Sequence, residues 1–372
     1  MLKYLTIRTN NNSFSFGLYE DKSIICSGFI KGIKSDEGFM EINYNNKKEK
    51  ENLTLTDNDS SRQLLDKLIS LGIITSYLDI RTIGFKVLGH SQDNHLMITD
   101  KLLDEIKEMD YSAYEVISSF NCYSNITKIA VFDGSFFNTV SEVNYLYPVY
   151  YSWYTNYNLR KNGYGGLRIR SIISKLGKDY KDKKIVFCDL DKDTLITAVD
   201  NLKCIDTSSI MSVRYSGSID PSIIPYMMER EGKNASEVVN ELKNNCGLVG
   251  LSSYYDVGTI MEQCQMLDDR AVAAKDRYIL EIVKYIAQYY VLLGGLDSIV
   301  FTGSISLDYS FIRREICEKL SVLGIKLDLD LNSNNDNDFQ IISSKESKIN
   351  IITSSCDEDS VILDDIMKYI NR

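Results

Sequence analysis

The stretch from Lys184 to Pro221 constrains the fold more than any other part of the chain. It contains an apolar run, a polar tip from Asp189 to Asp193 and a second apolar run, which is the pattern of a β-hairpin with buried strands. The stretch ends in the turn SGSIDP, whose proline is expected to open a helix. Along the rest of the chain, hydrophobic strand patterns alternate with amphipathic helix patterns, which predicts an α/β fold.

The acidic tip of this hairpin has two interpretations. Asp189, Asp191 and Asp193 alternate with other residues, so the tip is either a solvated acidic turn or a set of oxygen ligands for Ca²⁺ or Mg²⁺. A phosphate-binding loop is not expected here. Such a loop needs glycines, so that backbone N–H groups can approach the anion, and it needs to be free of nearby negative charge.

Length and charge limit the class of protein. At 372 residues the chain is long enough for two domains, and its apolar and charged fractions are those of a globular protein. With a net charge of −10 and no long basic block, nucleic acid is not an expected partner. No apolar run approaches the roughly 18–20 residues of a membrane helix, and the first residues lack a signal-peptide pattern. We therefore expect a cytoplasmic protein.

The distribution of cysteine and histidine limits the chemistry. The eight cysteines are scattered without a C-x-x-C motif, which is typical of reduced thiols and offers no zinc site. The chain has only two histidines, which restricts histidine-based catalysis.

Several further elements follow from hydrophobic periodicity and capping residues. Strands are expected within 3–31, at 80–88 and at 349–352, and helices at 60–71, 271–293, 309–323 and 361–370. Thr99 is expected to cap a helix with carboxylates in its first turn. Asp133 follows the apolar strand Ala130–Phe132, a position where α/β folds place catalytic groups, although a role in a turn or helix cap is the alternative.

The order of these motifs resembles the acetate kinase family over essentially the whole chain. The resemblance rests on the hairpin, the Asp-Thr-Ser and Ser-Gly-x-Ile-Asp-Pro segments that follow it, the AVFD segment ending at Asp133, and CGLVGLS at 246–252. It implies the two-lobed actin-like ATPase (ribonuclease H-like) fold of the acetate kinase type. Residues 1–136 and 357–372 would form lobe I and residues 137–356 lobe II. It also implies a homodimer that uses ATP and Mg²⁺.

The resemblance also implies which positions face the transferred phosphoryl group. Lys86 occupies the position of the family arginine that holds acetyl phosphate, Arg8 that of a phosphate-loop asparagine, and Asp133 that of the catalytic aspartate. Arg214 lies one residue before the place of a second family arginine, and Gly165 replaces a histidine that donates to the phosphoryl group.

The nucleotide positions are changed more strongly. Asp189, Asp191 and Asp193 lie where the family has a His-Leu-Gly-Asn-Gly phosphate loop. In the adenosine loop, which contains Gly303, two glycines of the family are replaced by Ser304 and Ser306. Asp256 is retained from an adenosine-binding pair. The glutamate that helps to bind Mg²⁺ in the family falls on Cys356 or Asp357.

Three functional hypotheses follow from these replacements. Phosphoryl transfer depends on positioning and on cationic and N–H donors around the moving group, so their loss predicts a protein without acyl phosphate:ADP phosphotransferase activity that acts as a binding or regulatory dimer. The alternative is an active carboxylate kinase with a rewired site that uses Lys86, Asp133, Arg8 and Arg214. A third hypothesis is a pocket for a small carboxylate or other anion, with Arg8, Lys86 and Arg160 as contacts.

Overall fold

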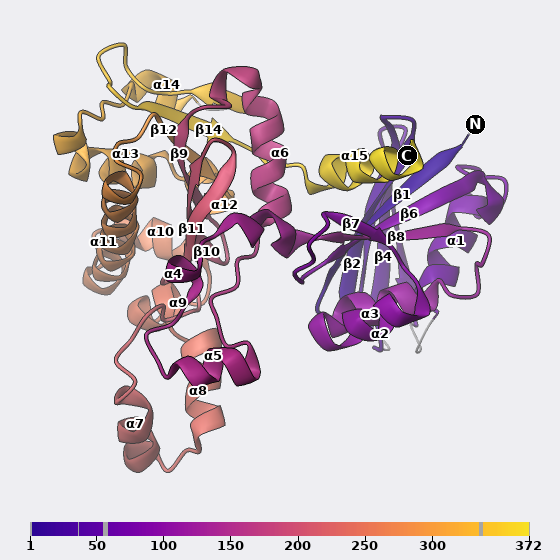
Figure 1. Cartoon of the computed structure of the whole chain (residues 1–372), viewed down its shortest axis with the longest axis horizontal. Helices are drawn as coiled ribbons and strands as arrows, with labels where there is room; N and C mark the ends of the chain where they lie inside the picture. Colours follow the sequence, from indigo (N-terminus) through magenta and orange to yellow (C-terminus); the bar gives the residue numbers. More distant parts are fainter. Residues whose placement is uncertain (1, 36, 55–58, 335–337, 372) are drawn as a thin grey trace. The chain divides into compact units, whose positions relative to one another are not determined.

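The computed structural model describes residues 2–35, 37–54, 59–334 and 338–371, which form two compact units (Figure 1). Unit 1 consists of Met1–Asn138, Tyr164–Ser171 and Asp357–Arg372, and unit 2 of Thr139–Gly163 and Ile172–Cys356. We expected all of 137–356 in the second lobe, but residues 137 and 138, and the segment 164–171, lie with unit 1. Backbone N–H groups of this segment donate to Asp133 of unit 1, which accounts for the difference.

Unit 1 is built on an eight-stranded sheet with the order β5-β4-β3-β2-β1-β6-β8-β7. Strands β1, β6 and β8 are parallel, and the other pairs are antiparallel. The strands are β1 Lys3–Asn10, β2 Ser13–Glu20, β3 Ser23–Lys31, β4 Gly38–Tyr44, β5 Lys47–Leu53, β6 Ile80–Val87, β7 His95–Met97 and β8 Thr127–Phe132.

The two faces of this sheet are covered by different helices. Helices α1 Ser60–Ser70, α2 Asp100–Met109 and α3 Tyr111–Ser119 lie on one face, and α15 Glu358–Ile370 lies on the other (Figure 1). Because side chains alternate along a strand, the apolar Leu5 and Ile7 of β1 enter the core beneath α1 and α3. The intervening Thr6 and Arg8 therefore face α15, and this alternation brings the first strand to the last helix.

Unit 2 is built on a six-stranded sheet with the order β11-β10-β9-β12-β14-β13, in which β9, β12 and β14 are parallel. The hairpin predicted after Lys184 is present, with β9 at Lys184–Leu190 and β10 at Thr194–Asp200. The other strands are β11 Lys203–Ser209, β12 Ser298–Thr302, β13 Phe339–Ile341 and β14 Asn350–Ser354.

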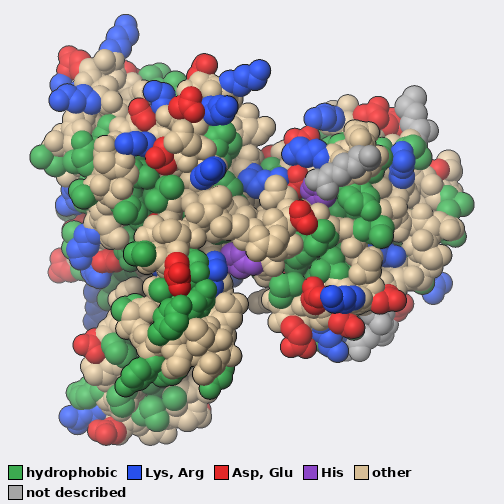
Figure 2. Space-filling view, in the orientation of Figure 1, with side chains coloured by type: hydrophobic (Ala, Val, Ile, Leu, Met, Phe, Trp, Pro, Cys, Tyr) green, Lys and Arg blue, Asp and Glu red, His purple; other side chains and the backbone are tan. Residues whose placement is uncertain are grey.

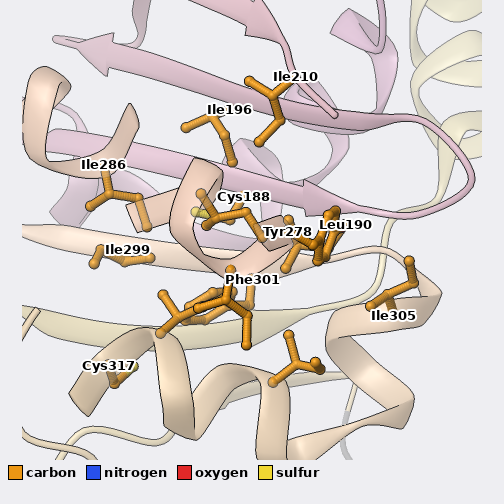
Figure 3. Close-up of a cluster of buried hydrophobic side chains, with 14 of the residues drawn as sticks. Cys188, Leu190, Ile196, Ile210, Tyr278, Ile286, Ile299, Phe301, Ile305 and Cys317 are labelled. Carbon is orange, nitrogen blue, oxygen red and sulfur yellow. The ribbon is translucent and has the colours of Figure 1, made fainter. Parts of the chain in front are cut away.

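The core of unit 2 packs this sheet against its helices. Tyr278 and Ile286 of the long helix α11 meet Cys188 and Phe301 from the sheet (Figure 3). The helices outside unit 1 are α4 Glu142–Tyr145, α5 Tyr151–Tyr157, α7 Ile223–Glu231, α8 Ala235–Asn244, α9 Gly247–Ser252, α10 Val257–Gln265, α11 Asp269–Leu292, α12 Ser304–Asp308, α13 Ser310–Lys319 and α14 Leu329–Ser333, while α6 Gly166–Leu176 begins in unit 1 and ends in unit 2.

Two local expectations were wrong. Asp189 and Leu190 belong to strand β9, so the hairpin tip is shorter than the predicted Asp189 to Asp193. Pro221 does not open helix α7, which begins at Ile223 with Ser222 as its cap residue. The N–H and hydroxyl of Ser222 donate to Asp220 at 2.8 and 2.6 Å, and this local turn delays the helix.

Within the part of the chain that the structure describes, no helix combines the length and apolar character needed to cross a bilayer.

Candidate functional site

Two buried or half-buried cations of unit 1 are held by carboxylates at the start of helix α15. The ammonium of Lys86, on β6, lies 2.5 Å from a carboxylate oxygen of Glu358. The guanidinium of Arg8, on β1, lies 3.3 Å from the other oxygen of Glu358 and 2.9 Å from Asp359. Thr6 adds a hydrogen bond of 2.8 Å to Asp359. Both cations that the sequence assigned to the substrate are therefore paired within their own unit.

Asp133 lies beside this cluster at the end of β8, where the sequence predicted a catalytic carboxylate. Its side chain is 1% exposed and accepts hydrogen bonds from the backbone N–H groups of Gly165 at 2.6 Å and Leu167 at 3.0 Å. One of its oxygens is 3.8 Å from the ammonium of Lys86. The carboxylate therefore anchors the start of helix α6. This is the structural role that the sequence left open as an alternative.

Charge pairing outweighs burial in the strongest of these contacts. Burial alone would lower the pKa of Lys86, but Asp133 and Glu358 raise it above its ordinary value. Burial would likewise raise the pKa of Glu358, but Lys86 and Arg8 hold it below its ordinary value. Burial raises the pKa of Asp359, and Arg8 only partly opposes this effect. At neutral pH the Lys86–Glu358 pair is fully charged.

The sequence did not single out Glu358 as part of the site. The family resemblance placed the Mg²⁺-binding glutamate at Cys356 or Asp357 instead. In the structure Asp357 caps helix α15, with its side chain accepting a hydrogen bond from the N–H of Ser360 at 3.1 Å. The run of carboxylates at Asp357, Glu358 and Asp359 was a visible signal, but it is also the ordinary composition of a helix start.

The hairpin end in unit 2 is acidic, as the sequence indicated. Asp189 is 4% exposed, whereas Asp193 is exposed. Asp191 accepts hydrogen bonds from the hydroxyl of Ser304 and from the N–H of Lys192, each at 2.8 Å. The carboxylate of Asp191 is thus bonded to the segment after β12 and to its own turn. Among the described residues no group of three or more His, Cys, Asp or Glu side chains could hold a metal ion.

The loop after β12 packs closely against strand β9 at Gly303. Gly303 has a φ of +84°, and a Cβ there would lie 2.6 Å from the carbonyl oxygen of Leu190. This glycine therefore serves the packing of the loop against β9 rather than the approach of a ligand. Two carboxylates, Asp189 and Asp191, adjoin the same loop. These residues do not fit a triphosphate, because phosphate sites need N–H donors and positive charge.

The remaining predicted contacts have structural partners in unit 2. The guanidinium of Arg214 donates to the carbonyl oxygens of Asn244 at 3.3 Å and Tyr255 at 3.1 Å. Asp256 caps helix α10 and accepts from the N–H and hydroxyl of Thr259 at 2.9 and 2.7 Å. The guanidinium carbon of Arg160 lies 3.9 Å above the ring of Tyr145.

Comparison with known proteins decides the family. A model of the acetokinase family matches residues 3–364. The chain belongs to the acetokinase family. Its relatives include the acetate kinases of Bacillus cytotoxicus, at 31% identity over the full length of both chains, and of Acholeplasma laidlawii, at 32% identity over the full length of both. The expected resemblance is confirmed.

Solved structures of acetokinase-family proteins confirm the expected fold. The structure resembles the acetate kinase of Porphyromonas gingivalis with a TM-score of 0.92 at 24% identity, and both chains are fully covered. It resembles a propionate kinase of Francisella tularensis with a TM-score of 0.89 at 25% identity, with 98% of each chain covered. The chain therefore has the α/β actin-like ATPase fold of the acetate kinases. As a family, acetate kinases depend on ATP and Mg²⁺. No step of a reaction can be derived through either group from the residues described above.

Proposed function

We propose that this chain is a member of the acetokinase family that lacks phosphotransferase activity and acts as a binding or regulatory protein. The observation that carries the proposal is the pairing of Arg8 and Lys86 with Glu358 and Asp359. A kinase site needs cations that face the phosphoryl group, because cationic and N–H donors supply most of the stabilisation in phosphoryl transfer. In this chain, Arg8 and Lys86 are paired with internal carboxylates instead.

Two further observations support the proposal. Asp133 accepts two backbone hydrogen bonds, so its oxygens are already engaged in holding helix α6. The hairpin end of unit 2 carries Asp189 and Asp191, where a triphosphate would need donors. Losses within one catalytic unit are not additive, but the removal of a single donor already reduces rates about 10²–10³-fold.

The test is a direct comparison with an active relative. The purified chain and Bacillus cytotoxicus acetate kinase are assayed in parallel with ATP and acetate, and in reverse with acetyl phosphate and ADP. We expect turnover from the relative and none from this chain above a heat-denatured control. Turnover by this chain within tenfold of the relative would overturn the proposal. Calorimetry with ATP·Mg²⁺ adds a measurement that is independent of turnover, and we expect no binding at millimolar nucleotide.

The second candidate is an active carboxylate kinase with a rewired site. Full-length relatives named acetate kinase, at 30–32% identity, favour it. It predicts turnover with ATP and acetate, propionate or butyrate that is lost in Asp133→Asn and in Lys86→Gln. Activity that survives both substitutions would exclude this candidate and point to a contaminating kinase.

We also propose that the chain forms a homodimer through unit 2. Hydrophobic side chains gather where Figure 1 places α5, α7 and α8 (Figure 2). Among them Tyr150 is 74% exposed, Tyr157 is 76% exposed and Trp153 is 43% exposed. Large exposed aromatic groups are typical of protein–protein contacts. Light scattering should give about twice the chain mass of 42.4 kDa, and Tyr150→Ser combined with Tyr157→Ser should shift the mass toward the monomer. A wild-type monomer at high concentration would contradict the proposal.

A further inference from the structure

Unit 1 contains a pocket that is separate from the ion-pair cluster. It has a volume of about 240 Å³, slightly below the range of about 300–1,000 Å³ for small-molecule sites, so only a small ligand would fit. One wall is the tip of the β1–β2 hairpin, with Asn10 and Asn12, and the opposite wall is helix α3, with Tyr111 and Tyr114. None of the residues that the sequence assigned to a substrate or nucleotide lines this pocket, although Arg8 belongs to the same β1–β2 hairpin.

The walls of the pocket are fixed by the surrounding structure. The loop after β3 is bonded to the hairpin tip through the N–H of Ile33 and the carbonyl oxygen of Asn12 at 3.0 Å. Helix α3 is held by Asp110, which accepts hydrogen bonds from the N–H of Ala113 at 3.0 Å and of Leu88 at 2.8 Å. A pocket with prearranged walls loses less conformational freedom when a ligand binds.

One cation and one anion meet at the pocket. Lys34, on the loop after β3, forms an ion pair with Glu115 of helix α3, and both residues line the pocket. Their side chains are 44% and 26% exposed. An exposed ion pair contributes little to stability, so breaking it when a ligand of matching charges binds costs little. The pocket therefore offers both signs of charge a short distance apart.

The remaining lining is of mixed character. Val116 and Ile33 provide an apolar floor, and Tyr111 and Tyr114 form an aromatic pair with ring centroids 5.8 Å apart. The hairpin-tip asparagines contribute amide groups that can donate and accept hydrogen bonds. A simple anion would meet the charge of Glu115, and a simple cation that of Lys34. A ligand that carries both charges on a small body satisfies both side chains.

We propose that this pocket binds a free α-amino acid in its zwitterionic form. The carboxylate of the ligand pairs with Lys34, its ammonium pairs with Glu115, and its side chain lies against Tyr114, Val116 and Ile33. The inference identifies a ligand class for a binding protein, but it does not depend on the loss of phosphotransferase activity. An active kinase could carry the same pocket.

The test is calorimetry of the full chain with each standard amino acid at millimolar concentration. We expect saturable binding of at least one of them. Its analogue without the amino group and its analogue without the carboxylate should each bind about tenfold more weakly or worse, because each loses one charged hydrogen-bonding partner. Absence of binding by every amino acid, or equal binding of either analogue, would overturn the proposal.

Two variants place the binding at this pocket. Glu115→Gln and Lys34→Gln should each weaken binding of the amino acid about tenfold. The matched control is Glu41→Gln, which breaks the ion pair of Lys48 and Glu41, at 2.8 Å, elsewhere in the same unit. Circular dichroism confirms that each variant is folded. An unchanged affinity of Glu115→Gln for the amino acid, or an equal loss of affinity in the control, would show that the amino acid does not bind at this pocket and would overturn the proposal. Acetate and ATP turnover is measured on the same samples, so the outcome for the proposed function is read separately.

Discussion

The start of helix α15 in unit 1 and the hairpin end in unit 2 are unsuited to a phosphate for different reasons. In unit 1 the cations are present, but Glu358 and Asp359 neutralise them. In unit 2 the sign of the charge itself is reversed, because Asp189 and Asp191 lie where donors would be needed. Under the proposed function, pairing would exclude phosphate from the first region and replacement of donors by carboxylates would exclude it from the second. We expect a single substitution to restore anion binding where the cations are paired, but not where carboxylates replace the donors.

The largest expected effect is on the stability of unit 1. Lys86→Ala leaves Glu358 and Asp133 buried without their shared cation, which should lower the free energy of unfolding by about 3–5 kcal/mol. The control is Lys22→Ala, which removes an exposed partner of Asp364 in the same unit and should change stability by about 0–1 kcal/mol. Urea denaturation measures both. Equal losses would show that the buried cluster has no special role.

A second substitution should reopen the paired site. Glu358→Gln removes the nearer of the two negative charges that Lys86 faces and one that Arg8 faces, so inorganic phosphate should bind to the variant and not to the wild type. With phosphate at about ten times its Kd, binding raises the free energy of unfolding by about 1.4 kcal/mol. The control is Asp364→Asn on the same helix, whose partner Lys22 is exposed. Equal stabilisation of the wild type by phosphate would show that pairing with Glu358 does not prevent phosphate from binding to the cations.

The third prediction concerns acid. The folded pKa of Glu358 lies below its ordinary value of about 4.3, so its contribution to stability is complete above that pH and is lost as the pH falls through the folded value. The raised pKa of Lys86 acts in the opposite sense: its contribution to stability is complete below its ordinary value of about 10.4 and is lost as the pH rises through the folded value. Below about pH 4, wild-type stability should therefore fall more steeply than that of Glu358→Gln, by up to about 1.4 kcal/mol per pH unit. Denaturation curves at several acidic pH values measure the slopes, and parallel slopes would contradict the prediction.

The smallest effect is expected in unit 2. Ser304→Ala removes a partly exposed hydrogen bond to Asp191 and should lower stability by about 0.5–1 kcal/mol. Asp191→Asn should not create ATP binding, because Asp189 remains beside the loop. A thermal-shift measurement with ATP·Mg²⁺ tests this expectation. Strong nucleotide binding by Asp191→Asn would show that one substitution restores binding in unit 2 as easily as in unit 1.

The fold could be predicted from the sequence to a large extent. Hydrophobic periodicity located the hairpin at Lys184, and capping chemistry located the helix after Thr99, whose hydroxyl accepts a hydrogen bond from Leu102. The errors were local. A turn at Asp220 moved the start of α7 beyond Pro221, because a side-chain hydrogen bond competed with the helix.

The site could be predicted only as a set of positions. The resemblance predicted Arg8, Lys86 and Asp133, but not their partners. In the Lys86–Glu358 pair the two residues are more than 250 residues apart in the sequence. No local pattern shows that Glu358 turns toward β6, since its neighbours Asp357 and Asp359 have the same charge and lie in the same helix turn. Which acid pairs with which base is decided by the packing of α15 on the sheet.

The return of helix α15 to the first strand also has a consequence for biosynthesis. Arg8 and Glu358 are separated by 350 residues. At a synthesis rate of about 5–20 residues per second, the ribosome needs roughly 20–70 seconds to make the chain between them. Throughout this interval the nascent sheet carries its two cations without their final partners and exposes the apolar face that α15 later covers. Unit 1 therefore cannot be completed before helix α15 has been synthesised.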